Sequence, residues 1–155
     1  MRMMWRMIAV AGILALAHSG YAQGDPNVGT WKLNLTKSKY NAGTAPKSAT
    51  VVVAAAGQGI KVASDTVLGD GSSRKISYTA NYDGKDMPVM GTPDYDMVAV
   101  TRNGNTITGT RKKGGKQVQT FTTVISADGK TRTTTTTGTD AKGQKVDNAQ
   151  VYDKQ

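Results

Sequence analysis

The chain has 155 residues, a formal net charge of +9, a single His and no Cys. Disulfide bonds, zinc–thiolate sites and iron–sulfur clusters are therefore excluded by composition. The one imidazole, His18, lies in an N-terminal segment that is predicted below to be removed, which leaves no His or Cys for nucleophilic catalysis or haem ligation.

Residues 1–22 have the organisation of an export signal. Arg2 and Arg6 form a basic start, residues 7–17 are apolar, and Gly-Tyr-Ala at 20–22 is a small-residue cleavage site. Eleven apolar residues are fewer than the roughly 20 that a membrane-spanning helix needs. We therefore predict cleavage after Ala22, a periplasmic or secreted protein, and no integral membrane span in the mature form.

The mature chain, residues 23–155, has a length that predicts one domain. Its formal charge falls to +7, because Arg2 and Arg6 leave and no acidic residue goes with them. A basic protein can attract anionic polymers, but the clusters of basic and aromatic residues typical of nucleic-acid grooves are absent. We expect no nucleic-acid partner.

In chain order, short β-prone runs alternate with turn signals, and no long helical periodicity occurs. Asn-Gly, Asp-Gly and Gly-Gly pairs supply the positive φ angles that tight hairpins require. Two longer connections, 36–48 and 86–95, are predicted to be loops. Nine strands are predicted, at residues 30–35, 49–55, 60–67, 74–82, 96–102, 106–112, 117–125, 131–137 and 147–153.

Short turns join sequence neighbours in antiparallel fashion, so the predicted fold is all-β, an up-and-down antiparallel meander. Eight or nine strands are enough to close such a meander into a barrel, which removes the exposed sheet edges. An open sandwich is the alternative fold.

The stretch TRTTTTTGT, residues 131–139, is predicted to be a strand rather than a linker, because β-branched Thr suits a pleated sheet. Side chains alternate between the two faces of a strand. Either Thr133, Thr135 and Thr137 or Thr134 and Thr136 must then face inward. The interior is expected to contain hydroxyl groups and small apolar side chains, either around a partly polar cavity or in a slender barrel without a pocket.

The sequence Gly29-Thr30-Trp31 resembles the first-strand signature of the calycins, the superfamily of lipocalins and fatty-acid-binding proteins. Residues 151–154, Val-Tyr-Asp-Lys, resemble the closing strand of the fatty-acid-binding proteins. The whole mature chain is similar to small, exported, lipocalin-like proteins of bacteria. The resemblance implies a lipocalin-like barrel of eight to nine strands in which Trp31 closes one end.

The resemblance also implies a non-enzymatic protein that binds a small lipophilic or amphipathic molecule inside the barrel. The candidate lining residues are the aromatic side chains of Trp31, Tyr78, Phe121 and Tyr152. Burial of Trp31 removes about 150–250 Å² from water, worth roughly 4–6 kcal/mol at most. This residue is therefore also a candidate core plug.

The chain departs from the fatty-acid-binding proteins where that family binds the ligand carboxylate. Gln150 stands at the position of one inward Arg, no Lys or Arg occurs within 117–127, and residues 36–48 show no counterpart of the helical lid. We expect no cofactor, and the ligand is left open.

The rival hypothesis is a solid barrel that binds an anionic envelope polymer or a protein partner. Arg102, Arg111 and Lys113 lie on two consecutive hairpins and form a candidate anion patch, although solvated hairpin ends are the simpler explanation for such residues.

Four acidic residues flank the proline-containing connection: Asp83, Asp86, Asp94 and Asp96. They could hold calcium or act as a carboxylate pair, but no twelve-residue calcium loop is present and Asp is a common turn residue. We predict turn chemistry, with no catalytic residue and no metal site.

Overall fold

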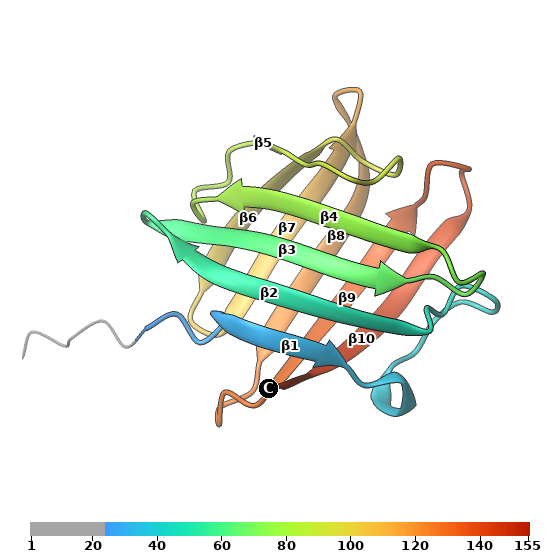
Figure 1. Ribbon diagram of the computed structural model, residues 1–155. Coiled ribbons are helices and arrows are strands. Elements are labelled where there is room, and N and C mark those ends of the chain that lie inside the picture. The colour runs from blue at the N-terminus through green and yellow to red at the C-terminus, as the bar shows by residue number, and fades with distance from the viewer. Residues whose placement is uncertain (1–23) are drawn as a thin grey trace, which may run out of the picture.

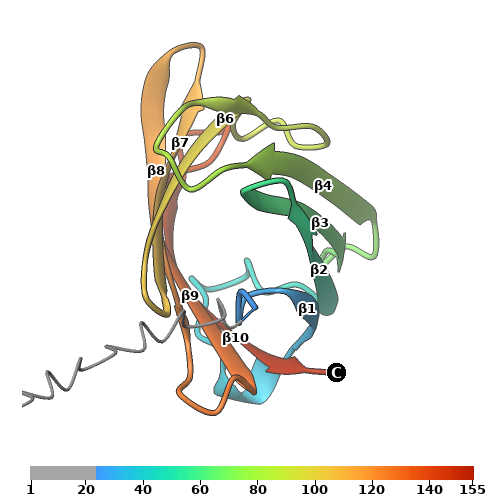
Figure 2. The same ribbon diagram turned by 90° about the vertical axis from the view of Figure 1, so that its left-hand side faces the viewer.

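The computed structural model describes residues 24–155, and the predicted signal peptide at 1–22 lies outside this range. A single antiparallel sheet has the strand order β4-β3-β2-β1-β10-β9-β8-β7-β6-β5 and curls into a barrel (Figures 1 and 2). A short 3₁₀ helix, η1 (Leu35–Lys37), follows the first strand. The strands are β1 (Gly29–Leu33), β2 (Ser48–Ala56), β3 (Gly59–Val67), β4 (Ser73–Ala80), β5 (Met87–Pro88), β6 (Met97–Asn103), β7 (Thr106–Lys113), β8 (Lys116–Ile125), β9 (Thr131–Thr139) and β10 (Lys145–Lys154).

The first and last strands are hydrogen-bonded to each other, with Trp31 opposite Lys154. On the other side, β4 meets the segment after β5 at a single bridge. Ser77 donates its N–H to the Met90 carbonyl at 3.1 Å, and Met90 donates back at 3.0 Å. Gly91 has a φ of 91° and lies so close to β4 that a Cβ would overlap backbone. The barrel is therefore nearly closed, and the alternative of an open sandwich is wrong.

The nine predicted strands correspond to β1–β4 and β6–β10, but the barrel has ten strands rather than eight or nine. The additional strand is β5, which lies in the connection 86–95 that was predicted to be a loop. It pairs with β6 through only Met87 and Pro88. Two residues, one of them proline, cannot display the alternating pattern by which a strand is recognised in a sequence.

The barrel interior is packed with apolar side chains around Trp31, which is fully buried. The indole N–H of Trp31 donates to the Asn27 carbonyl at 2.9 Å, so the segment before β1 is held against the barrel. Alternating residues of β2 and β3, such as Val53 and Ile60, belong to the same hydrophobic cluster as the indole. We call this end, where residues 25–31 pack, the closed end.

A polar cluster fastens the segment before β1 to the closed end. Tyr82 donates its hydroxyl to Asp25 Oδ2 at 2.6 Å, and Arg102 Nη1 lies 2.9 Å from Asp25 Oδ1. The Arg102 Nε–H donates to the Gly104 carbonyl at 2.7 Å, and its guanidinium carbon lies 5.7 Å from the centre of the Tyr82 ring. The charge of Arg102 is thus neutralised by a partner in the chain.

Hydroxyl groups do face inward, as the alternation of side chains requires. The inward set on β9 is Thr134 and Thr136, which are 6% and 4% exposed. On β8 the inward face carries Phe121 and Thr123 among its buried residues. Within residues 24–155, no helix has the length and apolar character needed to cross a membrane.

Candidate ligand cavity

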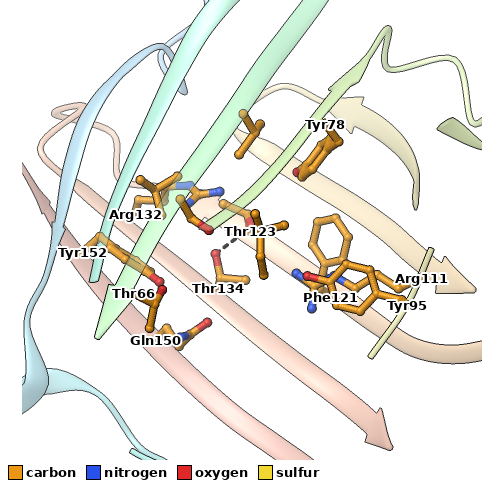
Figure 3. Close-up of a pocket in the computed structure, with 14 residues that line it drawn as sticks. Thr66, Tyr78, Tyr95, Arg111, Phe121, Thr123, Arg132, Thr134, Gln150 and Tyr152 are labelled. Atoms are coloured by element: carbon orange, nitrogen blue, oxygen red, sulfur yellow. Dashed lines mark hydrogen bonds between the residues drawn. The ribbon is translucent and has the colours of Figure 1, made fainter. Parts of the chain in front are cut away.

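A cavity of about 170 Å³ lies inside the barrel, beyond the apolar packing of the closed end (Figure 3). Its walls come from every long strand except β1 and β6, together with the segment before β6. They combine aromatic rings, small apolar side chains, hydroxyl groups, an amide and two guanidinium groups. The lining residues are Val51, Val62, Ser64, Thr66, Ile76, Tyr78, Tyr95, Arg111, Phe121, Thr123, Arg132, Thr134, Gln150 and Tyr152.

Arg132, on β9, places a positive charge in the cavity wall. The residue is 8% exposed, and its guanidinium carbon lies 5.6 Å from the centre of the Tyr152 ring. Among residues 24–155, its Nε–H has no acceptor and none of the ion pairs includes it. Burial lowers the pKa of the Arg132 guanidinium, but the group remains protonated in proteins. This charge therefore lacks a counter-ion from the described chain.

Arg111, on β7, is held far more firmly than Arg132. Its guanidinium carbon lies 4.7 Å from the ring centres of both Tyr95 and Phe121, a stacked arrangement that favours a cation. Its Nη1 donates to Gln119 Oε1 at 2.9 Å. The amide nitrogen of Gln119 donates to the Thr139 carbonyl at 2.9 Å, which fixes the amide with its oxygen toward Arg111. Arg111 is thus a positioned part of the wall.

A glycine makes room for this stack. Gly109 faces inward opposite Phe121 across β7 and β8, and a Cβ at this position would overlap the Phe121 ring. The register of the two strands shifts just beyond, between Arg111 and Lys112. The absence of a side chain at 109 leaves room for the ring beside the Arg111 guanidinium.

Neutral polar groups complete the wall. The hydroxyls of Thr123 and Thr134 form a hydrogen bond of 2.8 Å across β8 and β9, drawn as a dashed line in Figure 3. Gln150 donates its amide to the Tyr40 hydroxyl at 3.1 Å, which ties β10 to the connection after η1. These groups hydrogen-bond with one another but supply no negative charge.

Two cavity residues, Tyr78 and Tyr152, stay neutral at physiological pH. Burial raises the pKa of Tyr152 to about 12, with Arg132 opposing the shift. Burial likewise raises the pKa of Tyr78. Neither phenol therefore ionises to balance the charge of Arg132, and both hydroxyls keep their protons.

A second hollow of about 230 Å³ adjoins the cavity at the barrel mouth, with Tyr95 and Arg111 lining both spaces. Asp94 ties three segments together there. It accepts a hydrogen bond from Arg74 Nη1 on β4 at 2.9 Å, and its other oxygen accepts one from the Ala141 N–H in the β9–β10 hairpin at 3.0 Å. The other polar residues around the mouth are Thr44, Gln119, Thr136, Asp140, Gln144, Lys145, Asn148 and Gln150.

Three of the four aromatic residues proposed from the sequence line the cavity together: Tyr78, Phe121 and Tyr152. Trp31 does not line it, because its indole is enclosed by the packing at the closed end. Whether the three rings contact a ligand stays a prediction.

The structure does not bring the candidate anion patch together. Arg111 lines the cavity, and Arg102 is paired with Asp25 at the closed end. Lys113 is exposed at the opposite end of β7 from Arg102, which pairs with Ile107 near the start of that strand.

The four aspartates of the candidate acidic cluster each have a separate partner. Asp83 accepts from the Lys85 N–H at 3.0 Å, Asp86 pairs with Lys112, Asp94 pairs with Arg74, and Asp96 accepts from the Gly114 N–H at 3.1 Å. No group of three or more potential metal ligands occurs in the described part of the chain, residues 24–155.

The inward arginines were missed because Lys and Arg near hairpins are usually solvated. The alternation of side chains could have revealed them. Arg111 shares a strand face with Ile107, and Arg132 shares one with Thr134 and Thr136. Once Ile107 is assigned to the core, Arg111 must also point inward.

The fold is a nearly closed antiparallel barrel of ten strands with a cavity inside. The structure is similar to a crystal structure of the zebrafish ileal bile acid-binding protein complexed with cholic acid, with a TM-score of 0.50 and 12% sequence identity. The match covers 84% of this chain and 99% of the zebrafish chain. No protein-family model and no curated protein sequence matches the chain. At this identity the likeness establishes the fold alone.

Proposed function

We propose that this protein is a non-enzymatic, exported lipocalin-like barrel that holds a small, partly apolar ligand in its interior. The observation that carries the proposal is the cavity, in which aromatic rings are combined with two guanidinium groups. Binding sites for small molecules commonly combine apolar walls with a few convergent polar groups. The zebrafish protein of similar fold is a bile acid-binding protein in complex with cholic acid, which supports a small-molecule ligand for a barrel of this kind.

The predicted signal peptide supports a location in the periplasm or outside the cell. Cell fractionation with a C-terminal tag tests this part of the proposal. We expect the tagged protein outside the cytoplasm and a mature N-terminus at Gln23 by mass spectrometry. A cytoplasmic protein that retains residues 1–22 would contradict export.

Ligand binding is tested by native mass spectrometry of protein purified from its own host, and by calorimetry with a panel of neutral, anionic and cationic amphiphiles. Ser64→Phe fills the cavity from β3, whereas Ala63→Phe places the same ring on the outer face of that strand. We expect Ser64→Phe to abolish binding and Ala63→Phe to leave it unchanged. Failure of every amphiphile to bind the wild-type protein would contradict the proposal.

The rival hypothesis of a solid barrel that binds an anionic polymer has no comparable support, because its three basic residues lie apart. Ionic strength separates the two hypotheses. Attraction between exposed charges is screened by salt, whereas binding inside the barrel changes little. Binding that disappears as salt is added would favour the rival.

A further inference from the structure

The cavity has an unbalanced positive charge. Arg132 is more than nine-tenths buried, no Asp or Glu lines the cavity, and none of the ion pairs within residues 24–155 includes Arg132 or Arg111. A buried charge without a partner is costly, because it loses its hydration. An anion in the cavity would supply the missing partner. The wall thus favours an anionic ligand over a neutral or cationic one.

Arg132 rather than Arg111 is the group free to bind this anion. Arg111 is enclosed by two rings and already donates to Gln119. The Arg132 guanidinium lies beside the Tyr152 ring, lacks an acceptor for its Nε–H among residues 24–155, and points toward the middle of the cavity in Figure 3. A planar guanidinium matches a carboxylate particularly well, since two N–H groups can donate to its two oxygens.

The volume of the cavity limits the size of the ligand. A dry cavity of about 150 Å³ holds one benzene molecule, whereas sites for drug-sized ligands span about 300–1,000 Å³. At about 170 Å³, this cavity has room for one aromatic ring with a small substituent. The rings of Tyr78, Phe121 and Tyr152 supply the edges and faces against which such a ring packs.

The barrel mouth disfavours a longer apolar chain. A chain that extends past the residues common to both spaces, Tyr95 and Arg111 among them, enters the second hollow, where charged side chains such as Arg74, Asp94 and Lys145 lie. An alkyl chain there would displace water from charged groups without replacing their hydrogen bonds. The site is therefore suited to a compact molecule that stays within the cavity.

We propose that the ligand is a compact aromatic monocarboxylate whose carboxylate is bound by Arg132 and whose single ring packs against Tyr78, Phe121 and Tyr152. This inference rests on the proposed function, because it names the ligand class of the same site. Arg111 adds a second, fixed positive charge where the cavity adjoins the second hollow.

Calorimetry with four probes tests the ligand class on the wild-type protein. The probes are benzoate, benzyl alcohol as its neutral counterpart, benzylammonium as its cationic counterpart, and palmitate as a long-chain carboxylate. We expect benzoate to bind at least tenfold more tightly than each of the others. Equal affinities for benzoate and benzyl alcohol would overturn the claim that the ligand is an anion. A higher affinity for palmitate than for benzoate would overturn the size limit.

Two substitutions test the role of Arg132. Arg132→Met should weaken benzoate binding by about 10- to 100-fold, the range for hydrogen bonds to charged groups, and should leave benzyl alcohol unaffected. Lys130→Met, which removes an equal charge from an exposed side chain two residues away, should have no effect on either probe. Unchanged benzoate binding in Arg132→Met would overturn the inference.

The four-probe comparison needs no variant, so it remains decisive if Arg132→Met does not fold. Failure of the inference is also distinct from failure of the proposed function. If only neutral or long-chain amphiphiles bind, the ligand class is wrong but the binding barrel stands. If none of the amphiphiles binds, both are wrong.

Discussion

Arg102 and Arg132 lie in two regions of the barrel that differ in one respect: whether the positive charge has an acidic partner in the chain. At the closed end, Arg102 lies 2.9 Å from an Asp25 oxygen and also donates to a backbone carbonyl. In the cavity, Arg132 is more deeply buried, yet its Nε–H has no acceptor among residues 24–155. Desolvation of a partnered charge is largely compensated by its partner, whereas a charge without one is maintained at a cost to stability. The closed end therefore pairs its buried charge within the chain, whereas the cavity leaves one unpaired, in keeping with the ligand-binding role proposed for it.

The largest expected effect comes from removing the centre of the closed end. Trp31→Ala should lower the free energy of unfolding by about 3–5 kcal/mol, because a fully buried ring is replaced by a cavity. Urea denaturation measures this change. Phe121→Leu, in the cavity wall, is the comparison and should cost less. A loss below about 1 kcal/mol for Trp31→Ala would contradict the assignment of stability to the closed end.

The next effect concerns the ion pair at the closed end. Asp25→Ala leaves Arg102 and the Tyr82 hydroxyl without their shared acceptor. We expect a loss of about 1–3 kcal/mol in the free energy of unfolding, the usual cost of stranding such groups. Asp25→Asn retains one acceptor oxygen and should fall between Asp25→Ala and the wild type. If Asp25→Ala unfolds at the same urea concentration as the wild type, the cluster does not stabilise the closed end.

Alkaline pH should weaken the cavity wall through Tyr152. Its pKa is about 12 in the folded protein and about 10 in the unfolded chain. Below pH 10 both states keep the proton, and between pH 10 and 12 only the folded state does. Stability is therefore lost as the pH rises through this range, by about 2 kcal/mol for this residue.

Thermal unfolding at pH 9, 10, 11 and 12 measures the alkaline loss. Tyr152→Phe removes the titrating hydroxyl and keeps the ring beside Arg132, so the decline in stability should be shallower in this variant. Identical pH profiles for the variant and the wild type would show that other groups cause the loss. The raised pKa of Tyr82 at the closed end also comes from burial, so part of the decline should remain in Tyr152→Phe.

The smallest expected effect is a change in the free energy of unfolding that has opposite signs for Arg132→Met and Arg102→Met. Without ligand, Arg132→Met should raise the free energy of unfolding by about 1 kcal/mol, because an unpaired buried charge is replaced by an apolar side chain of similar length. Arg102→Met should lower it by about 1 kcal/mol, because Asp25 loses its partner. Chemical denaturation of the ligand-free proteins checks both. Destabilisation by Arg132→Met would mean that Arg132 serves the fold.

Much of the barrel could be predicted from the sequence because its determinants are local. Alternating β-branched residues and Gly-containing turns identified nine of the ten strands and their antiparallel order. The Thr-rich segment 131–139 was assigned to a strand with hydroxyls inside, and Thr134 and Thr136 are indeed buried. The two-residue strand β5 was missed, since its pairing depends on β6 and not on its own sequence.

The residues that line the cavity could not be predicted from any single stretch of the sequence, because they come from different strands. Closure of the barrel places three of the aromatic residues predicted from the sequence around one cavity: Tyr78, Phe121 and Tyr152. Trp31 is also predicted from the sequence as an aromatic lining residue, but the packing of residues 25–31 encloses it at the closed end.

The sequence alone determined where the strands and turns lie, because side-chain alternation and positive φ angles act over a few residues. Only the tertiary structure decided that Arg111 and Arg132 face the interior and that Arg132 is left without an acid. Burial and ion pairing depend on which strands surround a side chain. The surroundings of Arg132 on β9 include β3, β4 and β8, which come together only when the barrel closes.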